Sequence, residues 1–242
     1  MTTSQPVDLP GLQTLELFAT ATRFNQWLFE DIAKFCSGEI LEIGSGTGNI
    51  SKLLLEQFDA VTISDPHTRY CNILEKRFQN NSHLKGIFKV DLSVVDFEKN
   101  YPQLLNKFDA VVASNVIEHI KDDALAIKNC KKMLRQNGRL IILVPAFQFF
   151  YNSFDKELGH FKRYNKKNLG ALLQAQSMEV QHTQYFNFVG IAGWWLMGSV
   201  LKKKIIPRYQ LNFYNKLVPI FRLIDKLINR AAGLSVIAVA KC

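Results

Sequence analysis

The sequence predicts an α/β protein: a doubly wound, mostly parallel seven-stranded sheet with N-terminal helices and a helical insertion before the last strand. Short β-branched or apolar segments alternate with segments of helical periodicity between residues 39 and 184, as they do in successive βα units. The apolar segments are nearly continuous rather than alternating with polar residues. Strands of this composition are covered on both faces, as in a parallel sheet.

The first half of the chain contains three predicted strands separated by helices. Helical spacing of apolar residues such as Trp27 and Ile32 predicts one or two helices before the first strand. The second strand ends at Asp65-Pro66 and the third at Asp91-Leu92, and such residues typically stop a strand. In order, this half comprises the helical region 15–35, strand 39–43, helix 50–58, strand 60–64, helix 68–78 and strand 86–90.

The second half continues the alternation and then departs from it. The fourth strand reads F-D-A-V-V-A-S, and Asn137-Gly138 predicts a turn into the fifth. An aromatic and polar loop, residues 147–164, follows the fifth strand. In order, this half comprises strand 108–114, helix 122–134, strand 139–144, helix 166–176, strand 178–184 and strand 234–240. We expect residues 1–184 and 234–242 to form one domain, with residues 185–233 as an apolar and basic helical insertion.

A glycine loop follows the first strand, in the stretch L-E-I-G-S-G-T-G-N-I-S. Gly44, Gly46 and Gly48 alternate, and Asn49 stands where a third glycine would complete the dinucleotide pattern G-x-G-x-x-G. No G-K-[ST] follows, which excludes a P-loop. The loop therefore suits a ligand that approaches the backbone closely but has no pyrophosphate.

Four features at the ends of successive strands resemble the class I S-adenosylmethionine-dependent methyltransferases of small-molecule type, related to quinone O-methyltransferases. They are the loop Glu42-x-Gly44-x-Gly46-x-Gly48, the acid Asp65, the pair Asp91-Leu92, and the segment S-N-V-I-E-H-I after the fourth strand. The resemblance implies a Rossmann-like fold with S-adenosyl-L-methionine as cofactor, held at the carboxyl ends of the strands.

The resemblance also implies the cofactor-binding residues. The glycines let backbone amides approach the methionine part of the cofactor. Asp65 is expected to accept hydrogen bonds from the ribose hydroxyls, and Asp91 from the adenine amine. The full set of expected cofactor-binding residues is Glu42, Gly44, Ser45, Gly46, Gly48, Asp65, Pro66, Asp91, Leu92, Ser114 and Asn115. For Asp65 and Asp91 the alternative is simple capping of a strand end, and for Glu42 it is ordering of the loop.

Methyl transfer to a hydroxyl or an ammonium group needs a base, which is worth about 10²–10⁴-fold in rate. Histidine is the usual base near neutral pH. His119, at the lip of the cofactor site, and His160, in the loop after the fifth strand, are the leading catalytic candidates, with Tyr151 as a weaker one.

Some members of the wider family resemble an acid-x-x-Glu-His pattern that holds a divalent metal. The corresponding residues here are Asn115, Glu118 and His119, with His160 as a fourth ligand. Because Asn115 replaces the acid, one negative charge is missing from a site for a hard cation. We therefore predict no metal ligand in this chain.

The insertion contains the most distinctive segments of the chain. Residues 187–201 have no charge and include Trp194 and Trp195 before three lysines, which is typical of a membrane interface but short for a crossing. Residues 213–228 predict an amphipathic basic helix after Pro219. A substrate lid, a peripheral membrane contact, a dimer interface and a helical cap buried against the sheet all remain as interpretations.

We expect methylation of a hydrophobic small molecule, with oxygen as the favoured acceptor atom. The alternatives are an N- or C-methyltransferase of a secondary metabolite and a non-catalytic, membrane-associated cofactor-binding subunit. The net charge of +9 would suit nucleic acid, but no basic segment alternates with aromatics and the insertion is apolar, so we predict no nucleic-acid partner. Four scattered cysteines and the polar N-terminus predict a cytoplasmic protein, with peripheral membrane contact left open. The oligomeric state does not follow from the sequence.

Overall fold

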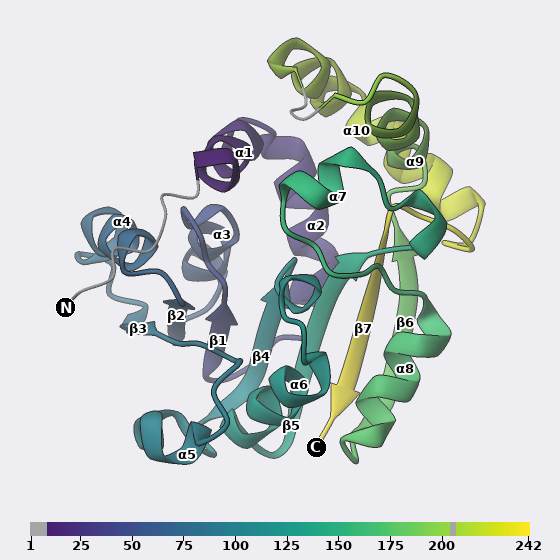
Figure 1. The fold of residues 1–242 in the computed structure, drawn as a ribbon. Coiled ribbons are helices and arrows are strands. Elements are labelled where there is room, and N and C mark those ends of the chain that lie inside the picture. Colours follow the sequence, from purple (N-terminus) through teal and green to yellow (C-terminus); the bar gives the residue numbers. More distant parts are fainter. Residues whose placement is uncertain (1–8, 204–206) are drawn as a thin grey trace, which may run out of the picture.

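The computed structural model describes residues 9–203 and 207–242. One seven-stranded sheet with the order β3-β2-β1-β4-β5-β7-β6 forms its centre, with helices on both faces (Figure 1). The first five strands pair in parallel, and β7 pairs antiparallel to both β5 and β6. The predicted fold class, a mostly parallel Rossmann-like sheet, is therefore confirmed.

The strands begin and end close to the predicted positions, and β5 differs most. The seven strands are β1 (Ile40–Ile43), β2 (Val61–Asp65), β3 (Leu84–Lys89), β4 (Phe108–Ser114), β5 (Leu134–Pro145), β6 (Glu179–Phe186) and β7 (Ser235–Lys241). In β5 the Asn137-Gly138 turn is a bulge inside the strand rather than a turn before it. The register against β4 shifts there, and Asn137 has a left-handed φ of 67°.

Helices fill the connections between the strands. The longer ones are α1 (Leu9–Ala19), α2 (Thr22–Ala33), α3 (Asn49–Gln57), α4 (Thr68–Phe78), α6 (Asp123–Met133) and α8 (Lys166–Ala175). The shorter ones are α5 (Phe97–Asn100) and α7 (Ser153–Glu157), with single turns at Pro102–Leu104, Ile117–His119 and Gln148–Phe150. The helical region predicted over 15–35 is two helices, because the chain turns at Thr20 and Ala21.

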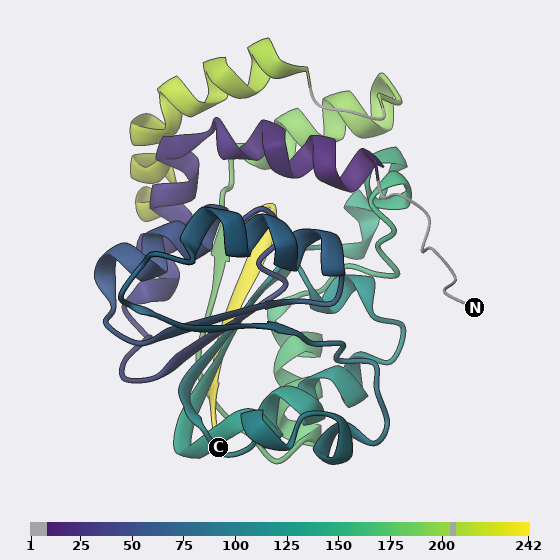
Figure 2. The ribbon, with the colours of Figure 1, turned by 90° about the vertical axis from the view of Figure 1, so that its left-hand side faces the viewer.

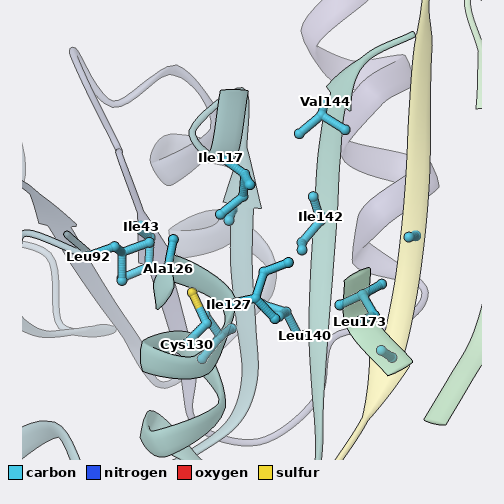
Figure 3. Close-up of a cluster of buried hydrophobic side chains, with 14 of the residues drawn as sticks. Ile43, Leu92, Ile117, Ala126, Ile127, Cys130, Leu140, Ile142, Val144 and Leu173 are labelled. Atoms are coloured by element: carbon cyan, nitrogen blue, oxygen red, sulfur yellow. The ribbon is translucent and has the colours of Figure 1, made fainter. Parts of the chain in front are cut away.

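The hydrophobic core lies on both faces of the sheet. Leu41 and Ile43 of β1 face α6, while Ile40 faces the other side, where α2 and α3 pack. This alternation follows from the two-residue period of a strand. Figure 3 shows the first of these clusters, with Ile127 and Cys130 of α6 against the sheet. Burial on both faces explains why the strands have continuous apolar sequences.

Helix α1 lies across the carboxyl end of the sheet (Figure 2). The Nδ2 amide of Asn49, at the start of α3, donates a 3.1 Å hydrogen bond to the carbonyl of Leu15. The Leu15 side chain also fills the space next to Gly46. The N-terminal helix therefore covers the glycine loop directly.

The segment between β6 and β7 forms α9 (Gly190–Trp194), the π-helical turn η4 (Trp195–Val200) and α10 (Arg208–Leu227). The prediction that the helix starts after Pro219 is wrong, because α10 begins eleven residues earlier and runs through this proline. Burial of Leu211 and Val218 on one face stabilises the helix despite the hydrogen bond that proline cannot make. None of the helices in the described ranges is both long and apolar enough to cross a membrane.

The two adjacent tryptophans of the insertion have different environments. Trp194 is half-buried: its Nε1 donates to the carbonyl of Phe150, and its ring packs on Phe154 and on the Arg163 guanidinium. Trp195 is 52% exposed. Trp194 is thus partly covered by the loop after β5, whereas Trp195 is largely accessible, and the interpretation of the pair as interfacial residues stays a prediction.

Candidate active site

The glycine loop has a left-handed backbone that favours glycine. Gly44, Gly46 and Gly48 have φ values of 70°, 54° and 84°, a region that side chains with a Cβ avoid. A Cβ on Gly44 would also collide with Val116, in the turn after β4. The loop thus comes very close to the segment that follows β4.

Glu42 lies beneath this loop rather than on its surface. The Oε2 atom of Glu42 accepts hydrogen bonds from the hydroxyls of Ser45, at 2.8 Å, and Ser51. Burial raises the pKa of this carboxyl to about 7. These bonds fit the alternative considered for Glu42, namely that it orders the loop, and Ser45 is held in the same cluster.

Asp65 lies at the carboxyl end of β2, facing the glycine loop. Its Oδ2 accepts the amide of Gly46 at 3.0 Å, and its Oδ1 accepts the amide of His67 at 2.9 Å. Oδ1 also lies 3.2 Å from Nδ1 of His67, so Oδ2 is the oxygen that retains a second lone pair for a ligand hydroxyl. Pro66, beside it, is half-buried at the same edge.

The other predicted cofactor residues lie at the ends of β3 and β4. Asp91 is half-buried and its Oδ1 accepts the amide and hydroxyl of Ser93, whereas Leu92 is buried in the core. Ser114 ends β4 half-buried, and Asn115 follows, exposed and with a left-handed φ of 54°. Parallel strands bring these residues to the same edge of the sheet.

These residues fit the predicted cofactor chemically. Along one edge of the sheet lie the glycines, which allow a ligand close to the backbone, Asp65, which suits ribose hydroxyls, and Asp91, which suits the adenine amine. The Oγ1 of Thr47, within the glycine loop, is buried without a hydrogen-bond partner among the described residues. Such an atom is costly unless a ligand or water satisfies it.

His160 is held by a buried ionic cluster that the sequence did not reveal. Its Nδ1 lies 2.8 Å from Oδ1 of Asp155, which also accepts the Nε of Arg163 at 2.8 Å. Burial alone would raise the pKa of Asp155, but its bonds to His160 and Arg163 together lower it. An ionised Asp155 only accepts hydrogen bonds, so Nδ1 of His160 bears a proton, and in the neutral imidazole Nε2 is then the acceptor.

Glu118 and His119 stand next to this histidine. Ligand atoms of Glu118, His119 and His160 all lie within 4.8 Å of one another, and the two imidazole rings are 4.7 Å apart. Burial raises the pKa of Glu118 to about 8. Both of its carboxyl oxygens are buried without a hydrogen-bond partner among the described residues.

This trio matches only part of a metal site. Two imidazoles and one carboxylate are a donor set found with zinc and iron, and Asp155 would orient His160 from the second layer. Against that, the nearby Arg163 guanidinium places a positive charge close to Glu118. Asn115 supplies no additional acid. The donor set is therefore poor for a hard cation such as Mg²⁺.

Tyr151, the weaker base candidate, is bonded within the same loop. Its hydroxyl donates to the carbonyl of His160 at 2.7 Å. Asp155 and Arg163 are the polar residues of this site to which the sequence assigned no role. The sequence feature that could have located them is the motif D-x-x-L-G-H-x-x-R-Y, which runs from Asp155 to Tyr164.

An apolar cavity of about 380 Å³ opens between the loop after β5 and the insertion. Its lining residues are Phe150, Phe188, Val189, Ile191, Ala192 and Trp195. A larger hollow, between α2 and α10, contains none of the predicted site residues. The smaller cavity thus lies between the loop after β5 and the insertion, the segment for which a substrate lid is one interpretation.

The strand order and the glycine loop are those of the class I S-adenosylmethionine-dependent methyltransferase fold. A SAM-dependent methyltransferase from Archaeoglobus fulgidus has the same fold, with a TM-score of 0.58 at 16% identity over 90% of this chain and 94% of that one. The CMeT domain of citrinin polyketide synthase is similar at a TM-score of 0.51 and 15% identity, over 84% of this chain and 45% of that one.

The sequence comparison agrees with the fold. Residues 41–140 match the family model described as a methyltransferase domain. A highly reducing polyketide synthase of Pyrenophora dematioidea is 29% identical over 127 residues, which cover 48% of this chain and 5% of that protein. The chain spans only 3–5% of the length of the curated relatives it matches. The fold and the family model thus agree on a methyltransferase domain of the kind that uses S-adenosylmethionine.

Proposed function

We propose that this domain transfers a methyl group to a hydrophobic small molecule, with oxygen as the acceptor atom. The observation that supports it is the Asp155–His160 pair, buried beside the turn after β4. An acceptor hydroxyl must lose its proton during transfer, and Nε2 of His160 is the group that would take it. The bound cofactor supplies an electrophilic methyl on its sulfonium.

The side chains around His160 have distinct parts in this proposal. Asp155 fixes the histidine tautomer and stabilises the imidazolium that forms when His160 takes a proton. Arg163 keeps Asp155 ionised. His119 packs against His160 and is the second base candidate. The apolar cavity beside Phe150 and Trp195 would hold the hydrophobic part of the acceptor and exclude water from it.

A carbon acceptor is the second candidate, favoured by the polyketide synthase relatives. A carbon between two carbonyls has an acidic proton, so it needs the same base at the same place. The two candidates differ in the product rather than in the site. Nitrogen is the third acceptor atom.

Isotope-labelled turnover tests the proposal. The chain is incubated with methyl-labelled S-adenosylmethionine and two acceptor sets, apolar phenols and apolar 1,3-dicarbonyls, and the methylated atom is read by NMR. We expect label on oxygen and a fall in kcat of about 100-fold or more for His160→Ala, with unchanged cofactor affinity. His83→Ala, remote from the site, is the matched control. Full turnover by both the His160→Ala and His119→Ala variants would exclude the base assignment.

The same assay separates two remaining alternatives. We expect turnover to persist in EDTA, because the Glu118–His119–His160 trio lacks a further acid; loss in EDTA that Mn²⁺ or Zn²⁺ restores would show a metal site. A chain that binds the cofactor tightly but methylates no acceptor would instead fit a non-catalytic subunit. Peripheral membrane contact is part of the proposal, because a water-insoluble acceptor is concentrated in bilayers.

A further inference from the structure

Helix α10 has an outward-facing apolar stripe along its whole length. Its exposed apolar residues, with 56–76% of each side chain accessible, are Tyr209, Phe213, Ile220, Leu223 and Leu227. They are three, four or seven residues apart, so they lie on one side of a 20-residue helix. The opposite side, with Leu211 and Val218, is buried.

The charges that flank this stripe are all of one sign. The basic residues of α10 are Arg208, Lys216, Arg222 and Lys226, and its single acid, Asp225, is 2% exposed and points inward. Arg222 pairs with Glu30 of α2 at 2.7 Å. Lys216 and Lys226 are exposed. The outer surface of the helix therefore presents apolar and cationic groups without an acidic one.

The apolar stripe and its flanking positive charges together favour one kind of binding partner for α10 over another. A second copy of the chain packed stripe to stripe would add its own exposed lysines to this face, without an exposed acid on either α10 helix to balance them. A surface of anionic lipids offers hydrocarbon for Phe213 and Leu227 and negative charge for the lysines. Charge complementarity thus favours the lipid surface.

We infer that the outer face of α10 binds anionic membranes, lying in the interface without crossing it. This inference deepens the proposed function, since it names the partner of the insertion. Figures 1 and 2 both show α10 at the end of the molecule where α9 lies. Membrane contact through α10 would bring the apolar cavity beside α9 towards the lipid phase that holds the acceptor.

Co-sedimentation with vesicles tests the inference, using phosphatidylcholine alone and phosphatidylcholine with phosphatidylglycerol. We expect binding to the anionic vesicles only. Lys216→Gln/Lys226→Gln should weaken it roughly 30-fold, from about 1 kcal/mol for each basic residue near an anionic surface and 1.4 kcal/mol per tenfold change in affinity. Phe213→Gln/Leu227→Gln should abolish it. Val95→Gln and Lys85→Gln, exposed residues remote from the insertion, are the matched controls.

Several outcomes would overturn the inference. They are equal binding to neutral vesicles, unchanged binding by both double variants, and sedimentation velocity showing a lipid-free dimer that Phe213→Gln/Leu227→Gln dissociates. The last would assign the stripe to a second copy. Cofactor affinity, measured by calorimetry, should stay unchanged in every variant. Vesicle binding needs no turnover, so a chain that binds anionic vesicles but methylates nothing would support this inference and refute the proposed function.

Discussion

Glu42 combines a buried carboxyl with two serine hydroxyls that donate to it. Its folded-state pKa of about 7 is above the ordinary 4.5 because burial disfavours the charged form. Between pH 4.5 and about pH 7, Glu42 has lost its proton in the unfolded chain but retains it in the folded protein. Folding stability contributed by this group is therefore present at low pH and falls as the pH rises from about 4.5 to about 7.

We predict that Glu42→Gln gains stability relative to the wild-type protein as the pH rises from 5 to 8. The gain is on the order of 3 kcal/mol, since each pKa unit corresponds to about 1.4 kcal/mol. Thermal unfolding of both proteins at the two pH values measures it. Taking the difference removes the contribution of Glu118, which titrates in both proteins. A constant difference across this range would show that Glu42 is ionised in the fold.

Gly44 allows a second residue-scale prediction. Alanine at this position would keep an unfavourable φ of 70° and meet the Val116 side chain. We expect Gly44→Ala to lower cofactor affinity by about tenfold or more and stability by about 1–2 kcal/mol. Calorimetry with S-adenosylmethionine measures the affinity.

Gly170→Ala is the control for this substitution. Gly170 lies within α8, with open space where a Cβ would be placed, so alanine there should stabilise the protein by about 0.5–1 kcal/mol. Unchanged cofactor affinity in Gly44→Ala would mean that the loop amides do not bind the cofactor.

The sequence located the residues at the strand ends but not the cluster around His160. The carboxyl ends of parallel strands meet at one edge, so Asp65, Asp91 and Ser114 could be grouped without coordinates. The pairing of Asp155 with His160 and Arg163 depends on the path of an irregular loop, to which hydrophobic periodicity does not apply. Which side chains approach one another in such a loop follows only from the three-dimensional structure.

At the scale of elements, the insertion is fastened to the sheet by Asp225. This side chain, buried in α10, accepts the amides of Asn187 and Phe188, just after β6, at 2.7 and 2.8 Å. Burial raises its pKa, although these amide bonds oppose the shift. The two hydrogen bonds fix the end of β6 to a helix that begins some twenty residues later.

We predict that Asp225→Ala loosens the insertion while the sheet stays folded. The buried amide of Asn187 and the half-buried amide of Phe188 would lose their acceptor, which costs about 1–3 kcal/mol for a buried group. Limited proteolysis should then cleave residues 188–203 faster than in the wild-type protein. Asp59→Ala, an exposed acid before β2, is the control and should leave the rate unchanged. Equal cleavage in both variants would show that apolar packing alone holds α10.

Elements with an apolar pattern were predictable, and those set by tertiary contacts were not. The buried strands were found because both of their faces are covered, which gives continuous apolar segments. Helix α10 was placed after Pro219 because proline normally starts a helix. In the structure, α10 also contacts α2 before Pro219. The amide of Phe24 donates a hydrogen bond to the Asn215 side chain, which supports the helix on the N-terminal side of this proline.

At the scale of the whole molecule, the net charge of +9 raises the question whether the acceptor is a nucleic acid or an apolar molecule, and salt dependence distinguishes the two. A nucleic-acid acceptor would bind through phosphates, so its affinity would fall about 10³–10⁵-fold between 50 and 200 mM salt. An apolar acceptor releases few counterions. We predict that KM for the acceptor changes less than about threefold over this range. Steady-state turnover at several salt concentrations measures KM, and a steep loss of affinity would point to a nucleic-acid acceptor.

Strand β7 lies between β5 and β6, yet it is made after both. Arg139 of β5 pairs with Lys241 of β7, about a hundred residues later in the chain, and pairings of such long range form slowly. Until β7 leaves the ribosome, β5 and β6 each present an unpaired strand edge. The time during which the insertion is synthesised is therefore when a nascent chain of this protein is most prone to aggregate edge to edge and most in need of a chaperone.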